Sequence, residues 1–287
     1  MTTEQPTIWE KMGKLDRRWI FLVIAVTVAI PMFLGIDFSA IPAPMVINLY
    51  KKIEALPPGS KVLVSFDYGP STVPENQPMA DAIVWHLLKK HCKVYFMATW
   101  ATGEAQASKT TEEVITTALP DVKYGVDYID LGFKAGGAGL MNTLYTNFKR
   151  MYTTDRTLKD INTFPIMEKI ESLKSFDMIL SVSSGSPGLK EWIQFVGDRG
   201  NIPLAGGVTA VQAMELYPYY PRQMFGLMAG LQGAAEYESI VIKNYPEYAP
   251  MRSALRKMAP QTIAHLAIIL LIVLGNVAYF TTRRKGR

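Results

Sequence analysis

Loops rich in glycine, serine and aspartate follow the short apolar runs of this sequence, and they are where chemistry is expected. They read DYGPST (67–72), TWATGE (99–104), KAGGAG (134–139), SSGSPG (183–188) and GGVTA (206–210). In open parallel sheets, ligands bind outside the carboxyl ends of the strands, where such loops gather. The candidate ligand-binding residues are therefore Asp67, Ser71, Asp130, Gly136, Ser184 and Thr209.

Carboxylates offer the best case for an enzyme. Asp67 ends the first apolar run and Asp130 the third, with Glu75 and Glu104 on neighbouring loops. A pair of these carboxylates could bind a divalent cation or act as acid and base, as in a metal-dependent hydrolase. Alternatively, Asp67 caps its own turn, which aspartate does well. The choice depends on strand order, which the sequence does not determine.

Other catalytic classes are excluded by missing residues. No loop ends in the Lys-Ser or Lys-Thr of a phosphate loop, and GGAG is not the dinucleotide spacing G-x-G-x-x-G, so ordinary turn chemistry is favoured. His86, His91 and His265 lie away from the strand-end loops, which leaves a serine or cysteine nucleophile without a base. A single cysteine, Cys92, rules out a disulfide framework and zinc sites built on cysteine pairs. We expect no catalytic residue, metal or cofactor.

The elements that must position these loops alternate along residues 37–261. Apolar runs at 61–66, 93–98, 126–132, 177–183 and 202–208 are separated by longer segments of helical period. Strands buried on both faces and alternating with helices indicate a mostly parallel sheet with helices on either side. The sequence predicts a doubly wound α/β domain of the Rossmann or flavodoxin-like kind.

Residues 217–248 depart from this alternation and hold six of the chain's 14 tyrosines, several beside proline. Between the tyrosine clusters lies a segment that we expect to be helical, with small residues at spacings of three and four. Small residues on one helix face let another backbone approach closely. Packing inside the domain is favoured, and a subunit interface is the alternative. Such an interface would use Gly226, Gly230, Gly233, Tyr217, Tyr219 and Tyr220.

Two uncharged runs, 19–36 and 262–280, have the length of membrane-spanning helices, and basic tails (1–18 and 281–287) flank them. Charged residues make up only 19% of the chain, and its net charge of +5 is not that of a nucleic-acid binder. Arg17 and Arg18 adjoin the first run on one side, whereas no Lys or Arg lies between 37 and 50 on the other. This predicts cytoplasmic termini and an extracytoplasmic domain, with a cytoplasmic domain as the alternative.

Two segments, SFDYGPSTVPE (65–75) and GLMAGLQGAAEYE (226–238), resemble a group of prokaryotic membrane proteins with terminal spanning helices and a middle α/β domain, for which no activity is assigned. The resemblance implies an architecture and a place in the prokaryotic cytoplasmic membrane.

Our first hypothesis is a non-enzymatic assembly or scaffold protein. Its partners would be the lipid bilayer and either copies of itself or other membrane subunits. A ligand-binding sensor or substrate-binding module that uses the strand-end loops is the alternative. The metal-dependent hydrolase comes last.

Overall fold

The computed structural model describes residues 16–35 and 40–285. It divides into two units, one formed by Met1–Phe38 with Arg256–Arg287 and the other by Ser39–Leu255. Residues 1–15 of the N-terminal basic tail and residues 286–287 of the C-terminal tail lie outside the described residues.

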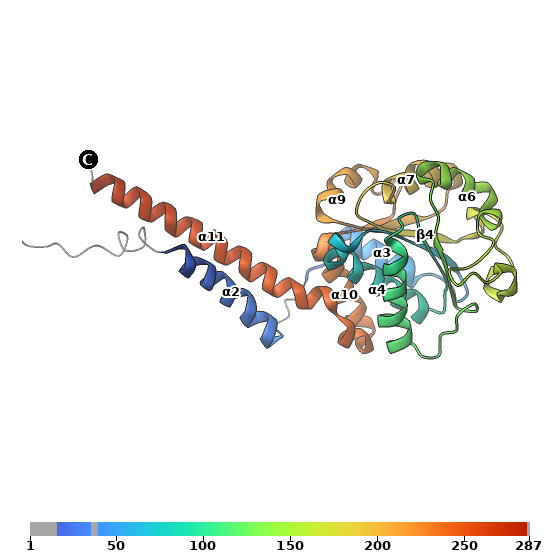
Figure 1. Ribbon diagram of the computed structural model, residues 1–287, viewed down its shortest axis with the longest axis horizontal. Helices are drawn as coiled ribbons and strands as arrows, with labels where there is room; N and C mark the ends of the chain where they lie inside the picture. The colour runs from blue at the N-terminus through green and yellow to red at the C-terminus, as the bar shows by residue number, and fades with distance from the viewer. Residues whose placement is uncertain (1–15, 36–39, 286–287) are drawn as a thin grey trace, which may run out of the picture. The chain divides into compact units, whose positions relative to one another are not determined.

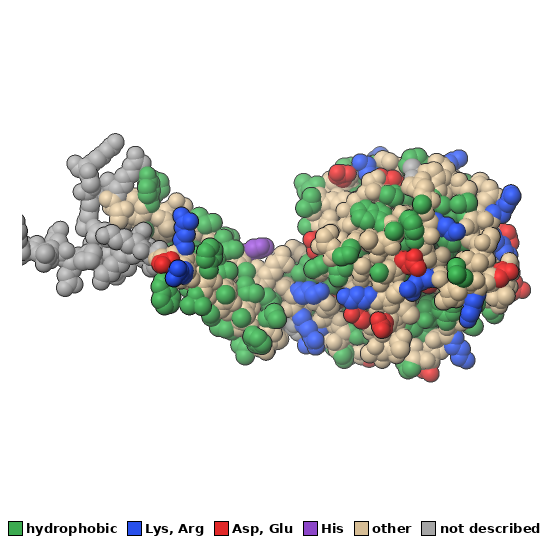
Figure 2. All heavy atoms as spheres, viewed as in Figure 1, with side chains coloured by type: hydrophobic (Ala, Val, Ile, Leu, Met, Phe, Trp, Pro, Cys, Tyr) green, Lys and Arg blue, Asp and Glu red, His purple; other side chains and the backbone are tan. Residues whose placement is uncertain are grey.

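Two helices, α2 (Arg17–Leu34) and α11 (Ser253–Lys285), are long and apolar enough to cross a membrane. The Asp16 side chain caps α2 by accepting a hydrogen bond from the backbone of Arg18. Hydrophobic side chains cover both helices, whereas charged side chains are spread over the α/β domain (Figures 1 and 2). The expected spanning runs fall in these helices, except that Gly35 is the C-cap that follows α2 and Ile36 lies outside the described residues.

Six parallel strands form one sheet in the order β3-β2-β1-β4-β5-β6. This is the strand order of the dinucleotide-binding folds, and it confirms the doubly wound parallel α/β architecture. The strands are β1 (Lys61–Asp67), β2 (Lys93–Ala98), β3 (Tyr128–Phe133), β4 (Met178–Ser183), β5 (Leu204–Val208) and β6 (Gly226–Ala229).

Helices cover both faces of the sheet, as two consecutive glycines of β5 show. A Cβ on Gly207 would lie 2.5 Å from Sδ of Met79 in α4, and a Cβ on Gly206 would lie 3.1 Å from Cδ2 of Leu189 in α7. The helices of the domain are α3 (Pro44–Glu54), α4 (Val73–Lys89), α5 (Gly103–Thr110), α6 (Gly137–Met151), α7 (Leu189–Trp192), α8 (Asp198–Gly200), α9 (Ala210–Leu216) and α10 (Gly230–Asn244).

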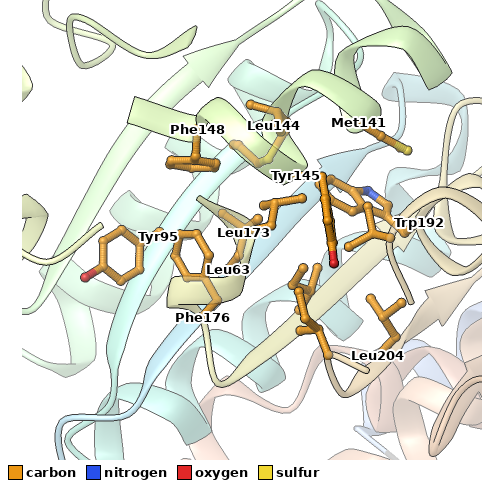
Figure 3. Packing of buried hydrophobic residues seen from close by; sticks show 14 of the residues in the cluster. Leu63, Tyr95, Met141, Leu144, Tyr145, Phe148, Leu173, Phe176, Trp192 and Leu204 are labelled. Carbon is orange, nitrogen blue, oxygen red and sulfur yellow. The ribbon is translucent and has the colours of Figure 1, made fainter. Parts of the chain in front are cut away.

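One hydrophobic cluster of the core lies between the sheet and the layer that contains α6 and α7 (Figure 3). Leu63 and Tyr95 point from neighbouring strands into this layer, where they meet side chains such as Phe148 of α6 and Trp192 of α7. The alternate residue of β1, Val64, is also fully buried, on the opposite face. This burial on both faces explains the continuous apolar runs of the strands.

The sixth strand corrects the sequence analysis, which expected a helix over these residues. Gly226–Ala229 forms β6, and helix α10 begins only at Gly230. A Cβ on Gly226 would lie 2.7 Å from Cβ of Leu49, so glycine is what lets α3 pack against this strand. Four small or apolar residues carry no period that separates a strand from a helix.

Candidate functional site

The strand order reverses between β1 and β4, and in this fold class ligands bind at that point. Asp67 and Ser183, the last residues of the two strands, are paired in register. The loops 68–72 and 184–188 therefore leave the sheet side by side. We take the loops that follow the strands as the candidate site and call them the strand-end edge.

Asp67 lies at the base of the strand-end edge and is fully buried. Its Oδ1 accepts hydrogen bonds from Ser65 Oγ (2.8 Å) and from Thr99 N and Oγ1 (2.9 and 2.7 Å). Its Oδ2 accepts from Ser181 Oγ (3.1 Å) and Trp192 Nε1 (3.2 Å). Burial raises the pKa of Asp67, and these hydrogen bonds oppose the increase. Because the chain's own donors fill both oxygens, Asp67 ties the ends of β1, β2 and β4 together rather than facing a ligand.

Trp100 closes the edge above Asp67. Its Nε1 donates to the carbonyl of Pro187 at 2.7 Å, and a Cβ on Gly185 would lie 3.1 Å from its ring. Trp100 follows β2, whereas Gly185 and Pro187 follow β4, and β1 lies between these strands. The indole therefore passes over the end of β1. Its partner, a carbonyl 87 residues further along the chain, leaves no signal in the sequence.

Carboxylates of the chain itself occupy helix N-termini along this edge. Glu75 Oε2 accepts from the backbone of Ala210, the first residue of α9, at 3.0 Å. Glu191 accepts from the backbone of Gly188 before α7 (2.8 Å) and from Ser186 Oγ (2.7 Å). Helix N-termini are where doubly wound folds bind phosphate. A phosphate-bearing ligand does not fit these two positions, because each already holds negative charge.

Asp130 lies inside β3 and is almost fully buried. Its Oδ1 accepts from the backbone of Gly132 at 2.9 Å, and Arg156 Nη1 lies 3.8 Å from its Oδ2. Arg156 also pairs with Glu104, Nε to Oε1, at 3.0 Å. Burial raises the pKa of Asp130 to about 6, although the Gly132 N–H and the Arg156 guanidinium oppose this.

The structure does not bring Asp67 and Asp130 together. Strand β2 lies between their strands, which places the two backbones roughly 10 Å apart. Across the described part of the chain, no three His, Cys, Asp or Glu side chains are grouped so as to hold a metal ion. The two-carboxylate site of the hydrolase hypothesis is therefore not formed, because strand order separates its members.

The other four predicted ligand-binding residues lie on separate loops of the same edge. Ser71 is exposed in a short 3₁₀ turn, and Gly136 is exposed at the start of α6. Ser184 is half-buried, and its backbone N–H donates to the carbonyl of Asp67 at 3.1 Å. Thr209 is buried just before α9. Of the six candidates, the structure joins only Asp67 and Ser184 by a hydrogen bond among the described contacts.

Two amide side chains beside the β4 loop were missed by sequence reasoning. Asn76 Nδ2 donates to the carbonyl of Ser183, and Gln212 Nε2 donates to that of Gly185, both at 3.0 Å. The carbonyl oxygens of both amides are buried and accept no hydrogen bond from the described residues. Buried acceptors normally have a partner, so these two oxygens are free for a hydrogen-bond donor such as water or a ligand. An isolated Asn or Gln carries no pattern that would reveal this.

The three glycines proposed for an interface pack inside the domain. Gly226 contacts α3, and a Cβ on Gly233 would lie 2.8 Å from the backbone of Met228. Gly230 has a φ of +61°, and a Cβ there would lie 2.8 Å from Cβ of Ala210. These small residues therefore serve contacts within the domain.

The tyrosines proposed for an interface differ from one another in exposure. Tyr219 and Tyr220 are half-buried, and their hydroxyls accept hydrogen bonds from Gln194 and Asn48. Tyr217, in contrast, is 41% exposed. It continues a stripe that sequence reasoning missed, since Val211 (88% exposed) and Met214 (72% exposed) precede it at intervals of three on α9. We call Val211, Met214 and Tyr217 the α9 stripe.

Comparison of the chain with protein-family models, with curated proteins and with solved structures finds no match. The geometry of the site is therefore the basis for any functional argument.

Proposed function

We propose that this chain is a membrane-anchored, non-enzymatic assembly protein. In this proposal α2 and α11 anchor it in the bilayer, and the α/β domain joins copies of the chain into a homo-oligomer. The observation that carries the proposal is the α9 stripe.

The α9 stripe has the chemistry of a protein contact. Residues three apart lie on one face of a helix, so Val211 and Met214 lie side by side on α9, and Tyr217 follows them at the start of the adjoining 3₁₀ turn. Methionine and tyrosine are enriched in the buried centres of protein interfaces. A second copy of the same chain is the proposed occupant, because two anchors would confine all copies to one membrane plane and raise their local concentration.

The strand-end edge supports a role without turnover of a phosphate substrate. Asp67 is saturated by internal donors, and Glu75 and Glu191 occupy two helix N-termini. The carboxylates of this edge accept hydrogen bonds from neighbouring segments of the chain, and these bonds stabilise the domain.

The proposal includes a prokaryotic cytoplasmic membrane, cytoplasmic termini and an extracytoplasmic domain, supported by the basic residues before α2. The test is Leu158→Cys, labelled in intact cells with a membrane-impermeant maleimide. Leu158 is 83% exposed, whereas the natural Cys92 is buried and provides no accessible thiol. Labelling without lysis is expected. Labelling only after lysis would contradict the topology.

The assembly proposal is tested on full-length protein in mild detergent. Light scattering at several concentrations is expected to give a discrete mass of several chains. The double variant Val211→Lys and Met214→Lys places two charges on the stripe, and we expect it to weaken association at least tenfold. Both side chains are exposed, so the fold should tolerate the changes.

Leu158→Lys is the matched control, because it replaces an exposed apolar side chain away from the α9 stripe. Its mass should equal that of the wild type. A wild type that is monomeric at all concentrations would overturn the assembly proposal. An oligomer that survives in the double variant would show that the α9 stripe is not the contact between copies. Binding of a different protein to the α9 stripe would contradict the proposal that a second copy occupies it.

A ligand-binding module remains the second candidate, favoured by the unpartnered oxygens of Asn76 and Gln212. Both are acceptors, and Glu75 lies beside Asn76 in the chain, so a small neutral or cationic hydrogen-bond donor fits better than an anion. A thermal-shift screen of amines, amides and sugars tests this. A hit should be lost in Asn76→Leu and retained in Ser71→Ala, and the absence of any hit would remove the candidate.

A further inference from the structure

Helix α10 contacts the chain at both places where the α/β domain continues toward an apolar helix. Glu236 Oε2 accepts from the backbone of Ala43 at 2.9 Å, directly before α3. Two residues later, Glu238 binds the first residues of α11. Both glutamates belong to the GLMAGLQGAAEYE segment, whose role neither the strand-end edge nor the α9 stripe explains.

Glu238 caps α11 with a fully buried carboxylate. Its Oε1 accepts from the backbone N–H groups of Ser253 (2.9 Å) and Ala254 (3.0 Å), and its Oε2 accepts from that of Leu255 (2.9 Å). The first N–H groups of a helix have no partner within the helix. A single side chain therefore satisfies three of the donors that α11 would otherwise leave open.

Of the described residues, the titratable side chains that act on Glu238 carry no positive charge. Asp81 of α4 is buried and acts on Glu238 as a second negative charge. Tyr248, in the 3₁₀ segment Pro246–Met251, is also buried, and its hydroxyl has no partner among the described residues. Asp81 in turn accepts from Gln77 and Thr110, and it also faces Lys109 and Glu113.

We infer that Glu238 is a proton-responsive joint, meaning that its contact with the first turn of α11 opens and closes as Glu238 loses and gains a proton. The contact of Glu236 with the backbone before α3 does not take part in this response. The joint is closed when Glu238 is buried on the first turn of α11 and open when that turn releases it to water. This inference stands on contacts inside the domain and does not depend on the assembly proposal.

The direction of the response follows from the environment of Glu238. Burial raises its pKa from 4.5 to about 7, even though three backbone N–H groups oppose the increase. The closed joint therefore binds the proton more tightly than the open one. The stabilisation is complete below pH 4.5 and is lost as the pH rises through about 7. The difference between these two pKa values corresponds to a shift of up to about 300-fold in the opening equilibrium.

Hydrogen–deuterium exchange on the full-length protein in detergent tests the inference. Exchange is measured from pH 6 to pH 8.5 and divided by the intrinsic rate at each pH. We expect the protection of Ser253, Ala254 and Leu255 to fall about tenfold across this range. A peptide that begins several residues before Ala43 and includes its amide should keep constant protection in the same samples.

Glu238→Gln removes the titration and should make the protection of these three amides independent of pH. Glu236→Gln is the matched control: it should alter protection near Ala43 and leave the pH response of α11 intact. A flat profile in the wild type would overturn the inference, and so would a wild-type profile in Glu238→Gln. If Glu238→Gln does not fold, the wild type still tests the inference, because the protection of the α11 peptide should depend on pH and that of the Ala43 peptide should not.

Discussion

Two polar clusters, one around Asp67 just before α4 and one around His86 in the last turn of α4, hold their charges in different ways. Asp67 is surrounded by neutral donors, namely hydroxyls, a backbone N–H and an indole. At the other end, His86 contacts Glu54, a partner that itself titrates. The first cluster therefore has one titratable group, Asp67, whose pKa burial raises, whereas the second joins His86 to a second titratable group.

The second cluster shows how burial overrides a nearby charge. His86 Nε2 lies 2.8 Å from Oε2 of Glu54, and its Nδ1 lies 2.7 Å from the hydroxyl of Tyr237. In a neutral imidazole, Nε2–H donates to the carboxylate and Nδ1 accepts from the hydroxyl. Burial lowers the pKa of His86 to about 4, although Glu54 opposes the decrease. Burial acts to raise the pKa of Glu54, but hydrogen bonds from His86, Lys90 and Tyr245 outweigh it and lower this pKa.

The largest effect on stability is expected when the first cluster loses the Asp67 carboxylate. Asp67→Ala leaves Thr99 N and Trp192 Nε1 buried without an acceptor, and it separates the ends of β1, β2 and β4. We expect a loss of about 3–5 kcal/mol in the free energy of unfolding. Thermal unfolding followed by tryptophan fluorescence measures it. Asp121→Ala removes an exposed carboxylate and is the control, expected to change stability by less than about 0.5 kcal/mol.

Acid is expected to reduce the free energy of unfolding through His86, by less than the loss expected for Asp67→Ala. The pKa of His86 is about 4 in the folded chain and 6.5 when unperturbed, so the unfolded chain binds the proton more tightly. The stabilisation is present above pH 6.5 and is lost as the pH falls toward 4. The gap of 2.5 units sets an upper limit of about 3 kcal/mol. Denaturant unfolding at pH 7 and pH 4.5 measures the difference.

Other groups oppose this acid response, so variants must isolate it. The pKa values of Asp81 and Asp130 are raised to about 6, which favours the folded chain as the pH falls. His86→Gln should remove the His86 contribution, whereas His91→Asn, at an exposed turn position, should retain it. Identical pH profiles in the wild type and His86→Gln would show that His86 does not titrate as described.

The sequence predicted much of the fold because strands that are buried on both faces appear as continuous apolar runs. Five apolar runs located five strands, and the run at 126–132 was observed as Tyr128–Phe133. Strand β6 was missed, because its four small or apolar residues pack through Gly226 against α3 and show no strand period. Side-chain period reports which face is buried but does not report strand order.

The site was less predictable, because its contacts join distant parts of the chain. Asp67 was identified from its position at a strand end, but its partner Trp192 lies 125 residues away. Whether Asp67 and Asp130 are neighbours depended on strand order, which placed β2 between them. Asn76 and Glu191 act through backbone groups of loops, and such contacts can be identified only once the loops are in place.

The smallest effects come from removing one hydroxyl from each cluster, and they compare the clusters directly. Thr99→Val deletes one donor to the fully buried Asp67, and we expect a cost of about 2 kcal/mol. Tyr245→Phe deletes one donor to Glu54, whose side chain is 36% exposed, so water can replace the hydroxyl and the cost should stay near 0.5 kcal/mol.

Each variant removes one hydroxyl that donates to a carboxylate, so the ratio of their costs measures how far water is excluded from each carboxylate. Urea unfolding of both variants beside the wild type provides that ratio. Equal costs would mean that water reaches Asp67 as easily as Glu54. In that case Trp100 would not close the strand-end edge, and Asp67 would again be available to a ligand.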